Sequence, residues 1–401
     1  MLRARVSHRE GDTVLQAASG NDLLLLSMRN LARLVGYCAQ YEFEDVISSV
    51  TGADRVLVGG ASALEWSRRA YKAIRLATGS PRFARHLTPP PAQIQLQRNY
   101  ELFFPIFNHP YELHALSCVP EWRSHCRLSA CFINEVWVHD LPHYLLELLS
   151  EFDHIFIGMR HSVDAVAQIT KRPCTYLPMA ADVLTFSPWP SPGPRTIDVC
   201  NVGRRSPVTH ATLVELTRER FLFCYFDTFS GGADKHQRTF FVEDPAEHRL
   251  LLANLLRRTR YYIAHRSRVN QTDYTGNRQE LSGRFFEGAA AGTVMIGEAP
   301  ALPEFAMLFD WPDALVHVPF DCPEIGRVIA ELDRDPERIL RIRCQNAAQS
   351  ALRHDWVHRL HSVFDVLGLP ATRRMIEREE RLRALAERAS AALANGGEVL
   401  A

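Results

Sequence analysis

The sequence has no excess of charge of either sign. Its 46 lysine and arginine residues balance 46 aspartate and glutamate residues, so the formal net charge is zero. A protein that binds nucleic acid through its overall electrostatic field carries a clear positive excess. We therefore expect no nucleic-acid partner.

Long hydrophobic runs are also missing. The run Leu23–Leu26 is far shorter than the roughly 20 apolar residues that cross a bilayer. The first residues, Met1–Asn21, are polar and lack the apolar core of a signal peptide. We expect no transmembrane segment and a cytoplasmic protein, and a peripheral membrane contact stays open.

The cysteines form no CxxC pair. There are 9 of them, an odd number, scattered along the chain. Cys131, Cys200 and Cys224 lie in apolar, strand-like runs, where a free thiol behaves as a small hydrophobic group. This pattern indicates a reducing compartment, with neither a disulfide framework nor a zinc site, and we expect no metal ligands.

The chain does have an alternation of short apolar strands and amphipathic helices, and it occurs twice. Such alternation predicts α/β domains, each with a parallel sheet covered by helices. Between the two halves, Phe186–Thr196 carries prolines at alternate positions, which predicts a stiff linker. The predicted parts are an N-terminal domain (1–186), a linker (187–196), a C-terminal domain (197–367), and a helix with a tail (368–401).

The segment Gly283–Gly297 is the most informative in the sequence. It predicts a short helix that ends at Gly292, because glycine adopts the left-handed cap conformation readily, and a buried strand after it. Arg284 and Glu287 are three residues apart and share a face near the helix N-terminus, a place that suits phosphate. The carboxylate of Glu287 is placed to accept hydrogen bonds from hydroxyl groups. Together they indicate a site for a nucleoside diphosphate that carries a sugar.

Two further segments of the second half could complete this site. The predicted strand Ile197–Val202 ends in Gly203, Arg204 and Arg205, where a phosphate could approach the backbone. The polar loop Asn270–Ser282 offers Arg278 and Glu280 as candidates for binding hydroxyl groups. Each segment alone is equally compatible with a solvated surface turn.

In the first half, Glu135 and His139 follow the predicted strand Ser129–Asn134. Glutamate and histidine commonly serve as general bases or orient hydroxyl groups, and Trp137 between them could stack on a sugar. A loop whose histidine only caps a helix explains the same pattern.

Residues 283–296 resemble the donor-site signature of GT-B glycosyltransferases of the "glycosyl transferases group 1" type, which include spore-maturation CgeB-like members. In that signature an arginine precedes Phe-Glu, three small residues and a glycine, and a strand follows. Further segments resemble the family in the expected order: Tyr176–Phe186, Asn201–Arg205 and His354–Leu360. The resemblance spans about residues 153–367.

The resemblance implies two Rossmann-like domains facing across a cleft, with a C-terminal helix that crosses back. The nucleotide sugar, which is a substrate and not a cofactor, would bind the C-terminal domain without an obligatory metal, and the acceptor would bind the N-terminal domain. Glu287 would bind the ribose, Arg204 or Arg205 the diphosphate, and Arg284 a phosphate or the sugar. The family's commoner Glu-x7-Glu pattern is altered here, because Gln279 occupies the first position and Glu280 follows it.

The leading hypothesis is a metal-independent hexosyltransferase that moves a sugar from a nucleotide-sugar donor to a hydroxyl acceptor. The alternatives are a sugar-nucleotide epimerase or hydrolase and a non-catalytic GT-B-like nucleotide-binding scaffold. The acceptor stays open among a glycan, a lipid, a protein and a small metabolite. The predicted catalytic residues are His139, Glu135 and Glu280. The predicted donor-binding residues are Gly203, Arg204, Arg205, Arg278, Arg284, Phe286 and Glu287.

Overall fold

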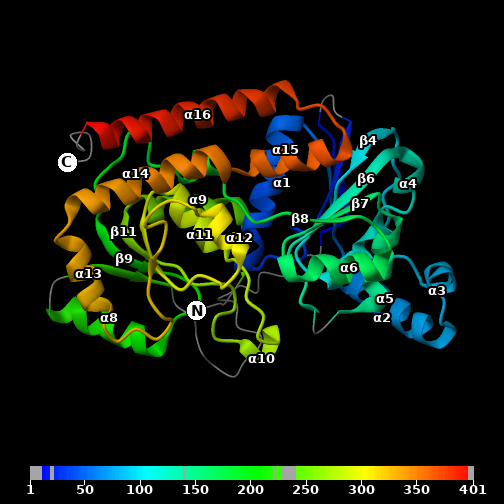
Figure 1. The fold of residues 1–401 in the computed structure, drawn as a ribbon. Helices are drawn as coiled ribbons and strands as arrows, with labels where there is room; N and C mark the ends of the chain where they lie inside the picture. The colour runs from blue at the N-terminus through cyan, green and yellow to red at the C-terminus, as the bar shows by residue number, and fades with distance from the viewer. Residues whose placement is uncertain (1–10, 19–21, 139–140, 220–221, 228–240, 396–401) are drawn as a thin grey trace, which may run out of the picture. The chain divides into compact units, whose positions relative to one another are not determined.

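The computed structural model describes residues 11–18, 22–138, 141–219, 222–227 and 241–395. The chain divides into two compact units (Figure 1). Unit 1 contains residues 1–33 and 47–177, and unit 2 contains residues 34–46 and 178–401. The helix α1 (Cys38–Thr51) therefore begins in unit 2 and ends in unit 1.

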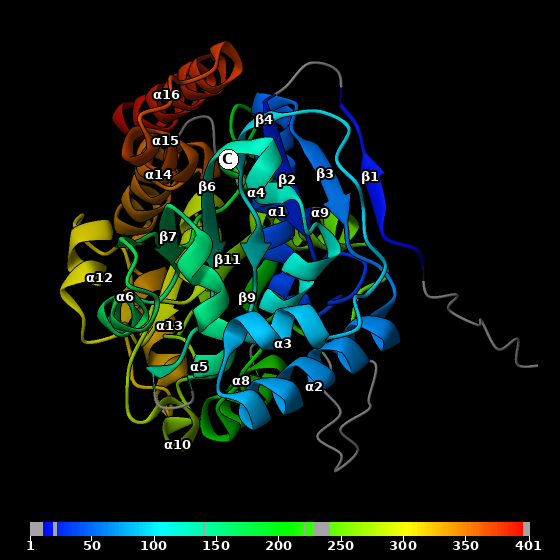
Figure 2. The same cartoon turned by 90° about the vertical axis from the view of Figure 1, so that its right-hand side faces the viewer.

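Unit 1 is built on a mainly parallel sheet in the order β1-β3-β2-β4-β6-β7-β8, with β5 paired to β2 and β6. Its strands are β1 (Val14–Gln16), β2 (Leu23–Ser27), β3 (Asp54–Leu57), β4 (Tyr100–Phe103), β5 (Ile106–Phe107), β6 (Cys126–Ile133), β7 (His154–Ile157) and β8 (Cys174–Tyr176). Every residue of β2 is buried, as expected for a parallel strand covered on both faces. Only β1, at the edge beside β3 in Figure 2, runs antiparallel to its neighbour.

Helices and helical turns cover this sheet. They are α2 (Ala61–Thr78), α3 (Pro81–Leu87), η2 (Pro110–Cys118), α4 (Trp122–His125), α5 (His143–Leu146), η4 (Glu147–Glu151), η5 (Arg160–Ser162) and α6 (Val163–Thr170). The alternation of strands and helices that the sequence predicted is present in this half. The sequence analysis did not predict β1, α3, η2 or α4.

Unit 2 has a fully parallel sheet in the order β10-β9-β11-β12-β13. Its strands are β9 (Ile197–Asn201), β10 (Cys224–Phe226), β11 (Thr259–Ile263), β12 (Val294–Gly297) and β13 (Val316–His317). Its helices are η1 (Val35–Tyr37), α7 (Val183–Phe186), α8 (Pro207–Glu219), α9 (Pro245–Arg257), α10 (Thr272–Thr275), α11 (Gly283–Ala290), α12 (Pro303–Leu308), α13 (Ile325–Asp333), α14 (Pro336–Arg353), α15 (Trp356–Leu367) and α16 (Arg373–Ala394). Val199, Tyr261 and Val294 from adjacent strands form its core with residues of α8 and α13.

The boundary between the units lies at Leu177–Pro178, before the predicted linker 187–196. That segment is anchored in unit 2 instead of spanning freely. Arg195 donates hydrogen bonds of 2.6–3.0 Å to the carbonyl oxygens of four residues: Leu256, Thr259, Ala291 and Gly292. Trp189, which belongs to the same segment, is buried. Alternating prolines stiffen the backbone, but these contacts make the segment part of the unit.

From the sequence alone, residues 336–367 are expected to form a single helix. That expectation is wrong, because α14 ends at Arg353 and α15 begins at Trp356. Asp355 between them has an extended backbone and caps α15. Its carboxylate accepts a hydrogen bond of 2.9 Å from the Val357 N–H. An aspartate side chain competes with helical hydrogen bonds in this way and starts a new helix. The final helix, α16, packs along α14 (Figure 1).

Candidate functional site

The carboxyl ends of all five strands of unit 2 lie at one edge of its sheet, since the strands are parallel. Gly203 follows β9, Asp227 follows β10, His265 follows β11 and Glu298 follows β12. The helix α11 starts after the loop that leaves β11. The structure thus brings the Gly203 turn and α11, which are separate in sequence, to the same edge.

Arg284 lies directly against the Gly203 turn. A Cβ atom built on Gly203 would lie 2.0 Å from Nη2 of Arg284, and Gly203 has a φ of +81°. The Nε–H of Arg284 donates to the Val202 carbonyl oxygen at 3.2 Å. Glycine is therefore required twice at this position, for its backbone conformation and for the space that the guanidinium occupies.

Arg284 is an unneutralised cation within the described part of the chain. No described carboxylate lies within ion-pair distance of its guanidinium, and the residue is partly exposed. It sits in the first turn of α11, where the Ser282 hydroxyl accepts from the Arg284 N–H at 3.4 Å. A helix N-terminus and a free guanidinium both attract an anion.

Arg205 is held differently, by Asp227. Its Nη1 lies 3.0 Å from Oδ1 of Asp227, and the Gly203 N–H donates to Oδ2 at 2.8 Å. Burial raises the pKa of Asp227 above its ordinary value, although the Gly203 N–H and the Arg205 guanidinium oppose this. Arg204, next to it, is partly exposed. Nη1 of Arg205 is thus held by Asp227.

The helix α11 lies close to the sheet because of Gly288. A Cβ at this position would lie 2.7 Å from Tyr262 of β11 and from Met295 of β12. The helix ends as the sequence predicted: Gly292 has a φ of +57°. The close approach at Gly288 thus packs α11 directly against β11 and β12.

Glu287 is only 8% exposed and forms an ion pair with Arg249 of α9. Nη1 of Arg249 donates to Oε1 of Glu287, while its Nε and Nη2 donate to Glu42 of α1 at 3.0 and 3.2 Å. Within the described residues, Oε2 of Glu287 accepts no hydrogen bond and is not among the buried unpaired atoms. One oxygen is thus held by Arg249, and the other has no hydrogen-bond partner among the described residues.

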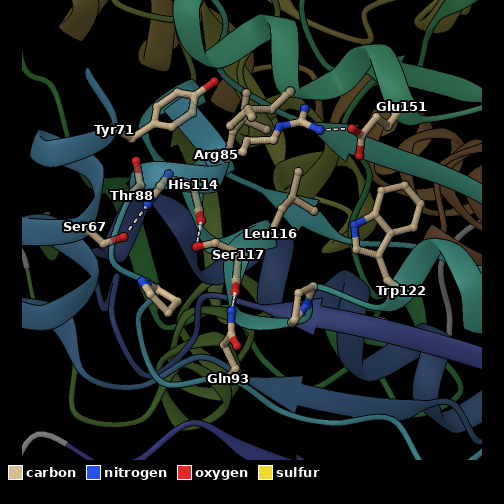
Figure 3. A pocket seen from close by; sticks show the side chains of 14 residues that line it. Ser67, Tyr71, Arg85, Thr88, Gln93, His114, Leu116, Ser117, Trp122 and Glu151 are labelled. Atoms are coloured by element: carbon tan, nitrogen blue, oxygen red, sulfur yellow. Dashed lines mark hydrogen bonds and ion pairs between the residues drawn. The ribbon is translucent and has the colours of Figure 1, made fainter. Parts of the chain in front are cut away.

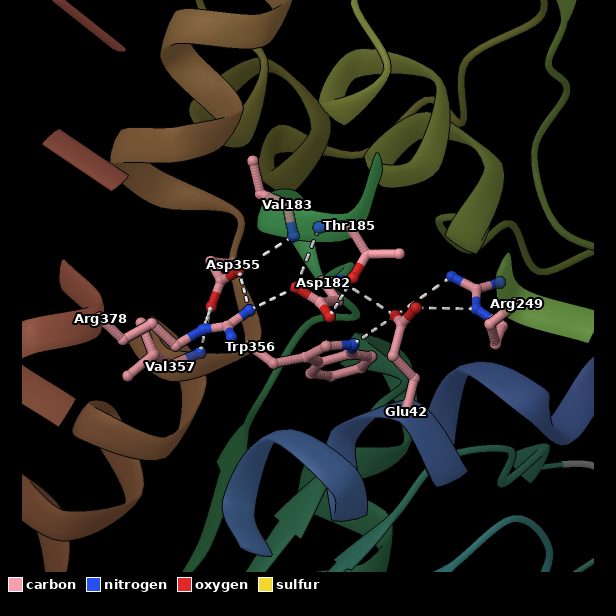
Figure 4. Close-up of polar contacts among 9 residues, drawn as sticks. All are labelled: Glu42, Asp182, Val183, Thr185, Arg249, Asp355, Trp356, Val357 and Arg378. Carbon is pink, nitrogen blue, oxygen red and sulfur yellow. Dashed lines mark hydrogen bonds and ion pairs between the residues drawn. The ribbon is translucent and has the colours of Figure 1, made fainter. Parts of the chain in front are cut away.

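Glu42 and Arg249 belong to a buried ionic network (Figure 4). Glu42 also accepts from the Trp356 indole N–H at 2.9 Å and from the Asp182 N–H at 3.0 Å. Burial raises the pKa of Glu42, and the attraction of Arg249 opposes this. Burial alone would lower the pKa of Arg249, but the two carboxylates hold it above its ordinary value. Arg249 therefore stays charged.

The network continues to the C-terminal helix. Arg378 of α16 binds Asp355 at 2.7 Å and Asp182 at 2.5 Å, and the Val183 N–H donates to Asp355 at 2.9 Å (Figure 4). These contacts, all made by residues of the unit that contains α11, join four helices: α1, α9, α15 and α16. The sequence analysis did not predict these roles of Glu42 and Arg249, because a charged residue in an amphipathic helix looks like part of a solvated face.

Residues 243–365 match the family model described as glycosyl transferase-like. The matched segment contains Arg249, Arg284 and Glu287, and it confirms the predicted resemblance for this region. The matched segment lies in the second of two α/β units, each built on a parallel or mainly parallel sheet, which is the fold class that the sequence predicted.

Three solved structures are similar to a large part of this chain. The accessory secretory protein 1, 2 and 3 structure from Streptococcus pneumoniae is 13% identical, with a TM-score of 0.39, over 72% of this chain and 55% of that one. TarM is 8% identical, with a TM-score of 0.41, over 66% and 54%. The glycotransferase of kitacinnamycin is 12% identical, with a TM-score of 0.35, over 87% and 98%. The chain thus spans about half the length of the first two. No curated protein matches it in sequence.

Three more predicted site residues lie in the glycosyl transferase-like segment, and the structure gives each a different environment. Phe286 is fully buried, with its ring edge-on to His354 at 5.1 Å, so it packs in the core. Arg278 is exposed. Glu280 is 1% exposed, and its carbonyl oxygen accepts from the Ser267 N–H at 3.0 Å. The side chain of Gln279 braces the same loop by accepting from the Ala301 N–H at 2.7 Å.

The three predicted catalytic residues are not joined by any described contact. Glu135 lies in unit 1, where its carboxylate accepts from the Trp137 indole N–H at 2.8 Å. His139 lies outside the described residues. Glu280 belongs to unit 2. Their roles stay predictions.

His265 is a further residue of the glycosyl transferase-like segment that the sequence analysis missed. Its Nδ1 accepts a hydrogen bond of 3.0 Å from the Glu298 N–H, so the proton of the imidazole is on Nε2. Burial, together with Arg284, lowers the pKa of His265 to about 4. Within the described residues, Nε2 makes no hydrogen bond and is not among the buried unpaired atoms. A neutral N–H donor is therefore available at the edge that carries Arg284.

We expect His265 to make the stability of unit 2 depend on pH. Its folded-state pKa of about 4 lies below the ordinary value of 6.5, so the unfolded chain takes up the proton first. Its contribution is complete above pH 6.5 and is lost as the pH falls towards 4, by roughly 2–3 kcal/mol. Urea unfolding measures the free energy of unfolding at pH 7 and at pH 4.5. Between these two pH values His265→Asn, whose side-chain oxygen can replace Nδ1, should lose less stability than the wild type. An equal loss in both proteins would contradict this.

Neither a metal centre nor a membrane span is found among the described residues. No three histidine, cysteine, aspartate or glutamate side chains among them are grouped so that they could hold a metal ion. None of the helices in the described ranges is both long and apolar enough to pass through a bilayer.

Proposed function

We propose that this protein is a glycosyltransferase that moves a hexose from a nucleotide-sugar donor to a hydroxyl acceptor. One observation carries the proposal: an unneutralised Arg284 seated on Gly203 at the N-terminus of α11, one turn before Glu287. The match of residues 243–365 to a glycosyl transferase-like family supports it.

The diphosphate of the donor would bind Arg284, the N–H groups of the first turn of α11, and Arg204. These groups place positive charge where the leaving diphosphate gains negative charge, which lowers the barrier to transfer. They also supply the charge that a metal ion would otherwise bring, so the proposed reaction is metal-independent. Oε2 of Glu287 would accept from a ribose hydroxyl, and Nε2–H of His265 would donate to a donor oxygen.

The acceptor would be a hydroxyl group of a glycan, a lipid, a protein or a small metabolite, in the cytoplasm. Glu135 and His139 of unit 1 remain the proposed acceptor-side base, and Glu280 the proposed third catalytic group. The transition state of such a transfer resembles an oxocarbenium ion, so positioning and stabilisation of the leaving group supply most of the rate.

The proposal is tested by the response of nucleotide binding to Glu287→Gln. Glutamine keeps an oxygen for Arg249 and loses the carboxylate that faces the ribose. We expect calorimetric titration, in the presence of a chelator, to show nucleoside diphosphate binding weakened by about 1–3 kcal/mol. The wild type should bind the ribonucleotide more tightly than its 2′-deoxy or 3′-deoxy form, and the variant should lose that difference.

Glu247→Gln, an exposed glutamate of α9, is the matched control and should bind as the wild type does. Unchanged discrimination between ribonucleotide and deoxynucleotide in a folded Glu287→Gln protein would remove Glu287 from the site. Tight binding of a nucleotide sugar without turnover against any acceptor class would favour a non-catalytic binding subunit. An absence of binding across all nucleoside diphosphates would contradict the proposal.

A further inference from the structure

Unit 1 contains a cavity of about 210 Å³ that is lined in part by residues of α2, α3 and η2 (Figure 3). Its apolar lining includes Leu113, Leu116 and Leu148. Its polar lining includes Ser67, His114 and Trp122. None of these residues belongs to the proposed donor site of unit 2.

Ser67 and His114 are paired in this cavity, but not as a nucleophile and its base. The Ser67 hydroxyl lies 2.7 Å from the Pro89 carbonyl oxygen and 2.8 Å from Nε2 of His114. A carbonyl oxygen can only accept, so the single hydroxyl proton goes to Pro89. Nε2 of His114 must therefore donate to Ser67, and the lone pair of the neutral imidazole lies on Nδ1.

His114 consequently offers a hydrogen-bond acceptor to the cavity. It is 5% exposed, and within the described residues its Nδ1 makes no hydrogen bond and is not among the buried unpaired atoms. Burial, with Arg68 nearby, lowers the pKa of His114 to about 4, so the ring is neutral at pH 7. An unfilled acceptor on a buried, neutral ring favours a ligand that donates a hydrogen bond.

Trp122 offers a donor in the same way. It is 4% exposed, and its indole N–H makes no hydrogen bond within the described ranges and is likewise absent from the buried unpaired atoms. Figure 3 shows the indole nitrogen on the side of the ring that faces Leu116, across the cavity from His114. The ring itself is fixed by stacking on Phe103 and Phe152, each at 5.0 Å.

The charge of the lining is balanced. Arg85 and Glu151, the charged side chains of the cavity, form an ion pair with each other. A charged ligand would lose its hydration without gaining a free counter-charge, whereas a neutral ligand would not. The volume is also informative, because an apolar cavity of about 150 Å³ accepts benzene.

We propose that this cavity binds a small neutral molecule with a ring-sized apolar body, a hydroxyl group at one end and a carbonyl group at the other. The hydroxyl donates to Nδ1 of His114, the carbonyl oxygen accepts from the indole N–H of Trp122, and the body packs against Leu116. The site is independent of the proposed nucleotide site, so either can fail without the other.

The test uses three probes of similar size and the full-length protein. These are 4-hydroxyacetophenone, 4-ethylphenol, which lacks the carbonyl, and 4-methylacetophenone, which lacks the hydroxyl. We expect each missing group to weaken binding about tenfold, the scale of one hydrogen bond to a buried partner. Trp122→Phe, which keeps the stacked ring, should weaken 4-hydroxyacetophenone about tenfold and leave 4-ethylphenol unchanged. Trp66→Phe, an exposed tryptophan of α2, is the matched control and should change neither.

Equal affinities for the three probes would overturn the proposal, and so would a Trp122→Phe protein that binds all three as the wild type does. If Trp122→Phe does not fold, Leu116→Phe replaces it, because the larger side chain fills the cavity. Loss of all three probes in that variant supports the site, and unchanged binding shows that the probes bind elsewhere and overturns it.

Discussion

Replacing Arg249 by leucine is expected to lower the free energy of unfolding of unit 2 by about 3–5 kcal/mol. Arg249 is buried between Glu42 and Glu287, and both carboxylates depend on it for charge compensation. Without the guanidinium, two buried carboxylates lie close together, and each must take up a proton or draw in water. Urea unfolding at pH 7, followed by circular dichroism, measures the loss.

The exposed Arg258, just after the same helix, supplies the control. Arg258→Leu removes the same charge but leaves no buried carboxylate without its partner. We expect it to change the free energy of unfolding by less than about 0.5 kcal/mol. Arg249→Lys should fall between the two, because an ammonium group keeps the charge but cannot bond both carboxylates in a fork. If Arg249→Leu and Arg258→Leu have the same stability, the network does not support unit 2.

Gly203→Ala is expected to weaken nucleoside diphosphate binding at least tenfold. The new methyl group would occupy the position of Nη2 of Arg284, 2.0 Å away, so the guanidinium must move from the turn. The φ of +81° adds backbone strain of about 1–2 kcal/mol for a residue with a side chain. Calorimetric titration of the folded variant measures the loss of affinity.

The variant Gly368→Ala serves as the control that separates the effect of backbone strain from the effect of displacing Arg284. Gly368 caps α15 in the same unit, has a φ of +67°, and has no atom within 4 Å of the position that a methyl group would take. That variant should lose similar stability and keep wild-type nucleotide affinity. A Gly203→Ala protein that binds nucleotide as well as Gly368→Ala does would show that Arg284 does not hold the diphosphate from its place on the turn.

The sequence by itself determined the local elements of this protein. Hydrophobic alternation predicted both α/β halves, and the small residues before Gly292 predicted α11 and its left-handed end, which the structure confirms. The spacing of Arg284 and Glu287 placed both near one helix end. These features depend on backbone preferences and on neighbours a few residues away, which are visible in a sequence.

Only the tertiary structure decided which distant groups meet. Arg249 and Glu42 are 207 residues apart, and the contact that joins them also fixes one oxygen of Glu287. Arg284 on Gly203, the proton on Nε2 of His265, and the anchored segment around Arg195 likewise depend on long-range packing. Side-chain charge and polarity are the same in a solvated face and in a buried network. Burial and the partner's position, which separate the two, exist only once the chain has folded.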